Sequence, residues 1–437
     1  MRFVRELTSW LSGGADPDSF PYRPVTAEFH RTGKHFVGKG LLALLDETRA
    51  HVAARATGAG PVDAGPVRLL RDFLDVALDK WDGRYDYRSY LALRLLGLPC
   101  GDGDGDGDGG GGGGAMAERA AARQGRDRLL VHLVADALAF ELAAAAGTTE
   151  LLPEQRPGPA LVAKRHRLGV RAVSPALSRL GLTVDDSQPA AAAAALHALA
   201  AADRSAAEER ALRLSMLPVY LSHDEYLFIR VLQAYECVFA GLADELRATI
   251  DAIDAGRAVA AAERVGYARD QLASAAPLFS LLASMQPESF RTFRAYTEGA
   301  SAIQSRSYKL MESLCRTPEG SRLDSAAYRS VPELRDRVRA GGPSVDAALR
   351  AAVRDGRLAG ADRALVELRM REFAATVLHW RRTHHRLAVR MLGERPGTGY
   401  TEGTPYLAEV RAIPVFTAVA ADPDPAAPSE PSGGCPE

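Results

Sequence analysis

The sequence predicts an all-α protein, and three observations support this class. Apolar residues recur at spacings of three and four in most of the chain, for example at 41–52, 66–81 and 129–145, which is the period of an amphipathic helix. Alternating β-branched residues bounded by turn pairs, which mark strands, are almost absent. Hydrophobic residues make up 47% of the 437 positions, enough for a sizeable helical core.

Composition and charge exclude some classes of partner. The formal net charge is -1, which gives no electrostatic reason to expect nucleic acid or an anionic membrane as a partner. The first residues lack the uninterrupted apolar core of a secretory signal, and we expect no stretch to approach the length of a membrane span. The four cysteines are far apart and form no CxxC pair, so the simplest expectation is a reduced, cytoplasmic compartment.

Three segments interrupt the helical pattern. The Gly/Asp run at 101–115 predicts a disordered loop, since glycine at this density is costly to order. A second soft region is expected at 185–202, where Pro189 precedes a run of alanines, and a disordered tail at 422–437. The predicted organisation is an N-terminal helical region over 1–182 and a helical core domain over 205–415.

The first segment with chemical character starts at His223 and reads HDEYLFIRVLQAYECVF. On a helix, Leu227, Val231 and Val238 lie on one apolar stripe, and Phe228 and Leu232 lie on a neighbouring one. A helix with two apolar stripes is expected to be buried on most sides. Its first residues, Asp and Glu, suit a helix N-terminus.

The second segment runs over 281–312 and contains two arginines one helical turn apart. Pro287 and Gly299 delimit a short predicted helix, which carries Arg291 and Arg294. An arginine held there can grip a carboxylate through two parallel hydrogen bonds. Spacing alone favours an ordinary solvated arginine over such a clamp.

The third segment, over 365–407, is a long predicted helix that stops at Gly393. His384 lies on its apolar stripe with Val377, Trp380 and Met391. A neutral, shielded imidazole on an apolar helical face is what an axial haem ligand needs. This feature alone favours a core histidine bonded to a carbonyl over a ligand. The Gly-rich loop that follows contains Thr398 and suits a segment that folds over a ligand.

Taken together and in this order, the three segments resemble the tryptophan 2,3-dioxygenase family. The first resembles the family pattern HDExLFIxxHQxYELWF. The second, FRTFR followed by ASAIQS and YKLME, resembles FxxFRxYLxxASGFQSxxFRLLE. The third, WRRTHHRLAVRMLGERPGTGYTEGTPYL, resembles WRxxHxxxVxRMLGxKxGTGGSSGxxYL, with the fourteen-residue separation of His384 and Thr398 that the family pattern requires. The resemblance covers about 220–410 and implies a helical-bundle haem domain with an N-terminal helical extension.

The resemblance also implies roles for individual residues. His384 is the implied proximal ligand of the iron of haem b, with Trp380 and Ser301 in the cofactor site. Arg294 is expected to bind the substrate carboxylate and Thr398 its ammonium group. The implied aromatic pocket is formed by Phe228, Phe290, Leu232 and Tyr90. Tyr90 belongs to Tyr87-Arg-Ser-Tyr90-Leu91, similar to a YxxYL element that closes the active site of an adjacent subunit in family members.

The implied reaction is the oxidation of tryptophan, or a close indole amino acid, by dioxygen at the C2=C3 bond, giving an N-formylkynurenine-type product of tryptophan catabolism. No catalytic side chain beyond the haem is implied. The distal histidine of the family pattern falls on Leu232, which cannot accept a hydrogen bond from an indole N–H. Two alternatives therefore stay open: a haem-dependent monooxygenase or hydroxylase of a modified aromatic amino acid, and an inactive haem-binding or scaffold protein. A homo-oligomer, tetramer or dimer, is expected.

Overall fold

The computed structural model describes residues 2–56, 65–99, 114–393 and 404–419. Within these ranges the chain forms α-helices α1 to α20 and four short 3-10 helices, without a β-strand. A single parallel bridge joins Glu154 and Ser222 just before α10. The predicted all-α class is therefore confirmed. Thr398, the Gly/Asp run up to residue 113 and the predicted tail at 422–437 lie outside the described residues.

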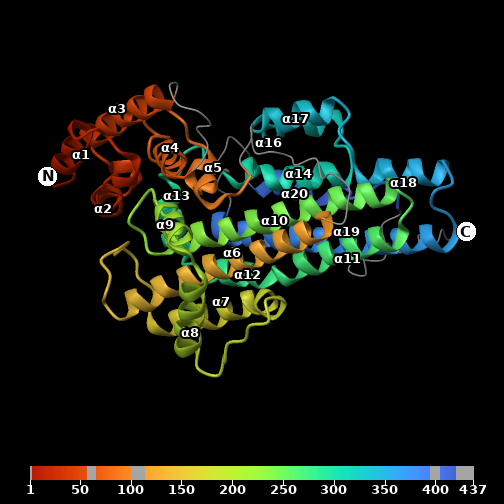
Figure 1. Ribbon diagram of the computed structural model, residues 1–437. Coiled ribbons are helices and arrows are strands. Elements are labelled where there is room, and N and C mark those ends of the chain that lie inside the picture. Colours follow the sequence, from red (N-terminus) through yellow and green to blue (C-terminus); the bar gives the residue numbers. More distant parts are fainter. Residues whose placement is uncertain (1, 57–64, 100–113, 394–403, 420–437) are drawn as a thin grey trace, which may run out of the picture.

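The first helices gather at one end of the molecule (Figure 1) and pack around a core of their own that includes Phe29, Leu45 and Phe73. The main chain of Lys34 joins this part to the segment before α10, since its N–H donates to the carbonyl of Pro218 at 2.8 Å. The helices of this part are α1 (Arg2–Ser12), η1 (Pro17–Ser19), α2 (Tyr22–Thr32), η2 (Lys34–Phe36), α3 (Lys39–Ala56), α4 (Pro66–Ala77), α5 (Tyr87–Tyr90) and η3 (Leu93–Leu96).

Long helices packed side by side form the centre of the molecule (Figure 1). Helix α10 contacts α6 and α11, and α11 contacts α19. As predicted, α10 is buried on most sides. The helices of this layer and its neighbours are α6 (Gly114–Ala145), α7 (Pro159–Arg179), α8 (Pro189–Asp203), α9 (Ala206–Leu214), α10 (Asp224–Asp254), α11 (Ala258–Ser274) and α19 (Gly360–Leu392).

Shorter helices complete the fold between α11 and α19 and after α19. Helix α19 ends at Leu392, and Gly393 follows with a φ of 62°, a left-handed conformation that favours glycine. The predicted stop at this glycine is confirmed. The remaining helices are α12 (Ala276–Leu282), α13 (Pro287–Arg294), η4 (Ala302–Gln304), α14 (Arg306–Cys315), α15 (Gly320–Leu323), α16 (Ala326–Arg329), α17 (Pro332–Arg339), α18 (Val345–Arg354) and α20 (Thr404–Ala412).

The prediction that 185–202 interrupts the helical pattern is wrong for most of this segment, because α8 begins at Pro189. Its Ala193, Leu196 and Ala200 are buried in the same hydrophobic core as side chains of α6 and α7. Alanine has the highest helix propensity, and proline is well tolerated in the first turn. A run of alanines therefore makes a helix whose small side chains allow close packing.

The expectation that no stretch approaches a membrane span also needs correction. Among the described residues, α10 (Asp224–Asp254) is long and apolar enough by length and composition, yet 89% of the relevant window is buried inside the protein. The core helix of a globular protein has these properties, so the match is weak evidence for a membrane.

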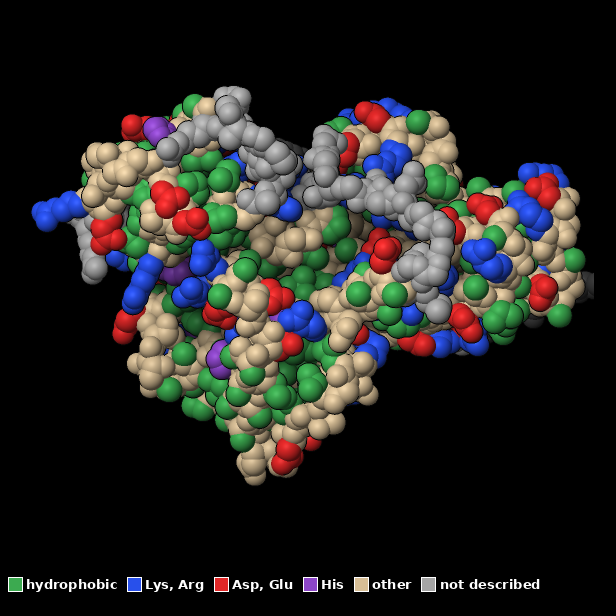
Figure 2. Space-filling model, in the orientation of Figure 1, with side chains coloured by type: hydrophobic (Ala, Val, Ile, Leu, Met, Phe, Trp, Pro, Cys, Tyr) green, Lys and Arg blue, Asp and Glu red, His purple; other side chains and the backbone are tan. Residues whose placement is uncertain are grey.

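Figure 2 shows acidic and basic side chains interspersed over one face of the molecule.

A buried polar cluster fixes the beginning of α10. The Arg165 guanidinium, fully buried on α7, donates to Glu141 of α6 and to Asp224, each at 2.7 Å. His223 lies 3.1 Å from the second oxygen of Glu141. Because buried charges are stable only when paired, this cluster holds α6, α7 and the first turn of α10 in one arrangement.

Candidate active site

A cavity is lined by residues of α10, α13, α14, α19 and α20. Its volume is about 230 Å³. Most of the lining is apolar or aromatic, with rings contributed by Tyr235, Phe239, Phe279 and Trp380. A concave, mostly apolar cavity with a few polar groups is the usual form of a cofactor or small-molecule site.

His384 lines this cavity from α19, on the stripe where the sequence placed it. Its ring lies 5.2 Å from the Trp380 ring and 6.1 Å from the Phe279 ring, measured between centroids. Burial, with a smaller contribution from the neighbouring His385, lowers the pKa of His384 to about 4. The imidazole is therefore neutral near pH 7, and it forms no hydrogen bond with another described residue.

Trp380 lies one helical turn before His384 and also lines the cavity. Its ring stacks on Tyr308 at a centroid distance of 5.4 Å and meets Phe239 edge to face at 5.2 Å. Among the described residues, no group accepts a hydrogen bond from its indole N–H. These contacts give His384 a rigid, apolar surrounding of aromatic rings.

The predicted aromatic residues Phe228 and Phe290 lie together at one part of the cavity. Their ring centroids are 5.6 Å apart. Phe293 completes this group, 5.2 Å from Phe228 and 5.5 Å from Phe290. Leu232 lines the same cavity from α10. Phe293 was missed from sequence because it lies on the buried face of a helix too short for its apolar period to be evident.

Tyr90 lines the cavity of its own chain. Its hydroxyl donates to the buried Glu225 carboxylate at 3.2 Å. Glu225 also accepts from the main-chain N–H groups of Val219 at 2.6 Å and Tyr220 at 3.0 Å. Helix α5, which carries Tyr87 and Tyr90, is thus tied to the first turn of α10. The N-terminal part thus contributes Tyr87 and Tyr90 to the cavity wall of its own chain.

Arg294 and Ser301 also line the cavity. Arg294 is the last residue of α13, one turn after Phe290. Arg291, on the same short helix, is exposed and does not line the cavity. Ser301 precedes η4, and its main-chain N–H donates to Gln304 at 3.2 Å. The structure therefore brings together His384, Trp380, Arg294, Ser301, Tyr90 and the predicted aromatic pocket, and only Thr398 lies outside the described residues.

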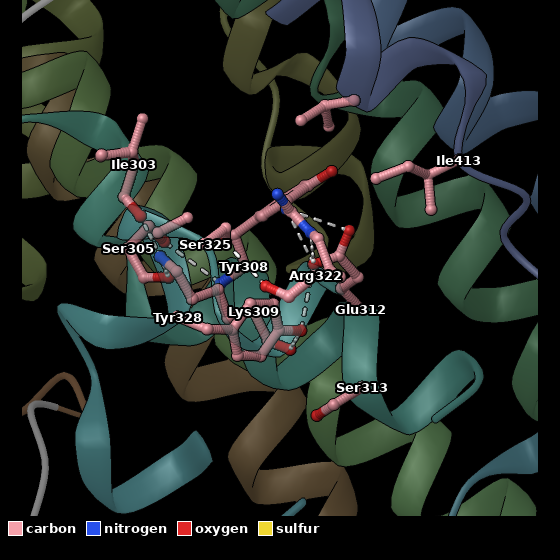
Figure 3. A network of polar contacts seen from close by, with 12 residues as sticks. Ile303, Ser305, Tyr308, Lys309, Glu312, Ser313, Arg322, Ser325, Tyr328 and Ile413 are labelled. Atoms are coloured by element: carbon pink, nitrogen blue, oxygen red, sulfur yellow. Dashed lines mark hydrogen bonds and ion pairs between the residues drawn. The ribbon is translucent and has the colours of Figure 1, made fainter. Parts of the chain in front are cut away.

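The wall formed by α14 contains an ion cluster that sequence reasoning missed (Figure 3). Glu312 accepts a hydrogen bond from Arg322 at 3.0 Å. It also accepts one from Arg381 at 3.3 Å. Tyr328 donates to the same carboxylate at 3.0 Å. Arg381 also donates to the Tyr308 hydroxyl at 2.8 Å. The cluster connects α14, α15, α16 and α19, so it joins α14 to α19, both of which line the cavity.

The two arginines of this cluster were not predicted as buried because a charged side chain normally lies in solvent. Burial alone would raise the pKa of Glu312, but the charges of Arg322 and Arg381 outweigh it and hold the pKa below its ordinary value. Only the three-dimensional arrangement reveals this compensation.

Comparison of the sequence with known proteins identifies the family to which the chain belongs. No family model matches the chain. The tryptophan 2,3-dioxygenase of Nocardioides sp. is 32% identical over 219 residues, which are 43% of this chain and 79% of that protein. The tryptophan 2,3-dioxygenase of Anaeromyxobacter sp. is 27% identical over 226 residues, 44% of this chain and 84% of the relative. That of Pseudomonas aeruginosa is 27% identical over 229 residues, 44% and 78% of the two chains.

These relatives are covered over most of their own length, while more than half of this chain lies outside the matched regions. The all-α fold and the cavity that gathers the family's motifs agree with the comparison. The chain therefore belongs to the tryptophan 2,3-dioxygenase family, as a divergent member with additional helices.

Proposed function

We propose that this protein is a haem-dependent dioxygenase that oxidises tryptophan, or a close indole amino acid, at the C2=C3 bond of the indole to an N-formylkynurenine-type product. The observation that carries the proposal is a neutral imidazole, His384, in the lining of an aromatic cavity that also contains Arg294. Family membership supports an oxygenase. The finer assignment depends on the residues of the cavity.

The residues present fit haem b. His384 is neutral and forms no hydrogen bond with another described residue, so an imidazole nitrogen is available as an axial ligand. Trp380, Phe279 and Met391 line the cavity around it and supply the apolar surface that a porphyrin requires. Ser301 is the proposed polar neighbour of the cofactor. When bound, haem iron supplies the dioxygen chemistry that none of these side chains can perform.

The protein's own contribution is to bind, orient and shield the substrate. Arg294 lies one turn from Phe290, so a guanidinium–carboxylate contact places the amino-acid end of the substrate beside the aromatic pocket. Phe228, Phe290 and Tyr90 then hold the indole ring by stacking and edge contacts. Thr398 is the proposed partner of the ammonium group. Holding two reactants in one orientation in a dry cavity accounts for much of the rate enhancement in such reactions.

A second candidate function is a monooxygenase or hydroxylase acting on a modified aromatic amino acid. The observation that favours it is Leu232, which lines the cavity where a hydrogen-bond acceptor for the indole N–H would be expected. Product analysis with labelled dioxygen distinguishes the two. Two labelled oxygen atoms with an opened ring support the dioxygenase, and one labelled atom with an intact ring supports the alternative.

The test of the cofactor assignment is a pair of neighbouring variants on α19. His384→Ala is expected to abolish stoichiometric haem binding or the histidine-ligated ferrous spectrum. His385→Ala is the control, because that side chain does not line the cavity. Normal haem spectra in both variants would contradict the assignment of His384.

The test of the carboxylate clamp uses the two arginines of α13. Arg294→Ala is expected to weaken tryptophan binding, measured by optical titration of the reduced haem protein, and to leave the haem spectrum intact. Arg291→Ala is the control, since Arg291 is exposed outside the cavity. Equal affinity in the two variants would refute the clamp.

A further inference from the structure

The Glu236 side chain is a buried acid that the proposed reaction does not use. It lies on α10 one helical turn after Leu232, is 1% exposed and lines the cavity. Neither of its carboxylate oxygens accepts a hydrogen bond from another group in the described part of the chain. Because an unsatisfied buried carboxylate is costly, its persistence in a cavity wall points to a partner that binds there.

Other buried polar groups of α10 are fully paired, which sets Glu236 apart. The Arg230 guanidinium donates to Asp136 at 2.7 Å and to Ser215 and Gln233 at 2.8 Å. The Gln233 amide donates to the carbonyl of Leu91 at 2.8 Å. Glu225 accepts three hydrogen bonds, as described above. The fold therefore satisfies its buried groups on this helix except where the helix faces the cavity.

The surroundings of Glu236 form one polar corner of the cavity. The Lys309 ammonium donates to the main-chain carbonyls of Ile303 and Ser305 (Figure 3), the latter at 3.2 Å. Lys309 forms no ion pair with Glu236 within 4.0 Å, although it is near enough to affect the carboxyl's pKa. The hydroxyls of Ser305, Ser307 and Tyr87 also lie near enough to lower the carboxyl's pKa, but none meets the distance and angle of a hydrogen bond to either carboxylate oxygen.

The charge balance of this corner selects a neutral polar ligand group. Burial raises the pKa of Glu236, opposed by the nearby hydroxyls and by Lys309. Burial, with the charge of Arg322, lowers the pKa of Lys309 to about 7. A cationic ligand group placed here would be repelled by the Lys309 ammonium, and an anionic group would be repelled by the Glu236 carboxylate. A neutral hydroxyl satisfies the carboxylate without either repulsion.

We propose that Glu236 determines substrate specificity by accepting a hydrogen bond from a hydroxyl group on the aromatic ring of the substrate. The preferred substrate class is then a ring-hydroxylated indole amino acid. Leu232 leaves the indole N–H without an acceptor, and Glu236, one turn further along the same face of α10, supplies an acceptor for a different ring substituent. This inference rests on the proposed function, because it takes Arg294 and the aromatic pocket to hold the amino-acid end and the ring.

The experiment is a set of optical titrations of the reduced, haem-loaded protein with three kinds of ligand. These are L-tryptophan, the positional isomers of hydroxy-L-tryptophan, and the matching methoxy-L-tryptophans, which have no donor. We expect at least one hydroxy isomer to bind about 10- to 100-fold more tightly than tryptophan and than its methoxy counterpart, the effect of a hydrogen bond to a charged group. Equal affinities throughout the series would overturn the inference and leave Glu236 satisfied by water.

Two variants identify the acceptor. Glu236→Met keeps an unbranched side chain of similar length without an acceptor and is expected to abolish the preference for the hydroxy isomer. Glu236→Gln keeps an acceptor but loses the charge, so it is expected to retain only part of the preference. A preference that survives in Glu236→Met would assign the contact to another group and overturn the inference. If Glu236→Met does not load haem, the wild-type ligand series and Glu236→Gln still decide.

The outcomes also separate this inference from the proposed function. If no aromatic amino acid perturbs the haem spectrum of the wild-type protein, the proposed function fails and the inference fails with it. If tryptophan binds through Arg294 but hydroxylation gives no advantage, the proposed function stands and only the role of Glu236 is refuted.

Discussion

The ion cluster around Glu312 allows a quantitative prediction. Its carboxylate accepts hydrogen bonds from Arg322, Arg381 and Tyr328 at 3.0, 3.3 and 3.0 Å. The side chains of Glu312, Arg322 and Arg381 are only 6%, 9% and 3% exposed. Glu312→Gln removes the negative charge and leaves two buried guanidinium groups without compensation. Removing one partner of a buried ion pair costs about 3–5 kcal/mol of the free energy of unfolding, a large part of the roughly 5–15 kcal/mol that stabilises a typical protein.

The measurement is urea unfolding followed by far-UV circular dichroism, with Glu319→Gln as the matched control. Glu319 also pairs with an arginine, Arg316, at 3.4 Å, but its side chain is 73% exposed. A solvent-exposed pair of this kind contributes about 0–1 kcal/mol. We expect the Glu312→Gln variant to unfold at clearly lower urea concentration than the control. If the two variants unfold at the same concentration, the cluster does not stabilise the cavity wall as argued.

Three further predictions follow from the structure. The pKa of Glu312 is held below its ordinary value, so the stability that its charge contributes is present at neutral pH. This contribution is lost as the pH falls below about 4.5 through the folded-state pKa. The difference in unfolding free energy between wild type and Glu312→Gln should therefore shrink as urea titrations move from pH 7 to pH 3. Gly33→Ala should destabilise the protein by about 1–3 kcal/mol, measured by thermal unfolding, because Gly33 has a φ of +78° and an added Cβ would lie 2.7 Å from the carbonyl oxygen of Val219. Leu232→His should strengthen L-tryptophan binding to the haem-loaded protein by about 1–3 kcal/mol, since it supplies an acceptor for the indole N–H, whereas Leu232→Met should not.

Each of these three predictions has an outcome that contradicts it. A difference that stays constant or grows in acid would show that the charge of Glu312 is not the source of its effect. A Gly33→Ala variant of wild-type stability would mean that the N-terminal helices do not pack closely on the segment before α10. Equal tryptophan affinity in Leu232→His and Leu232→Met would place the indole N–H away from α10.

The parts of the fold that were predictable from sequence are those whose signal is local. The period of apolar residues in α10 and α19 and the glycine after Leu392 depend on neighbours along the chain. The position of His384 facing the cavity also follows from its stripe. Helix α8 was missed because a run of alanines has no contrast between apolar and polar faces, so its burial depends on α6 and α7.

The parts that were not predictable depend on contacts between distant segments. Arg165, Arg322 and Arg381 are charged residues that sequence patterns assign to solvent, and they are buried only because Glu141, Asp224 and Glu312 meet them in space. Glu236 gave no sequence signal, since its importance rests on the absence of a partner in the folded protein. Such compensation between distant charges is invisible in a one-dimensional pattern.

The distribution of the cavity walls along the chain has a consequence for biosynthesis. Tyr87, Phe228 and Arg294 leave the ribosome well before His384, which lies on α19, and α20 follows later still. Until α19 is made, the aromatic surfaces of α10 and α13 lack their covering helix and resemble the exposed apolar surface of a folding intermediate that chaperones recognise. On the proposed function, binding of haem through His384 therefore follows translation of α19, and a nascent chain arrested before this helix would be a target for aggregation and proteolysis.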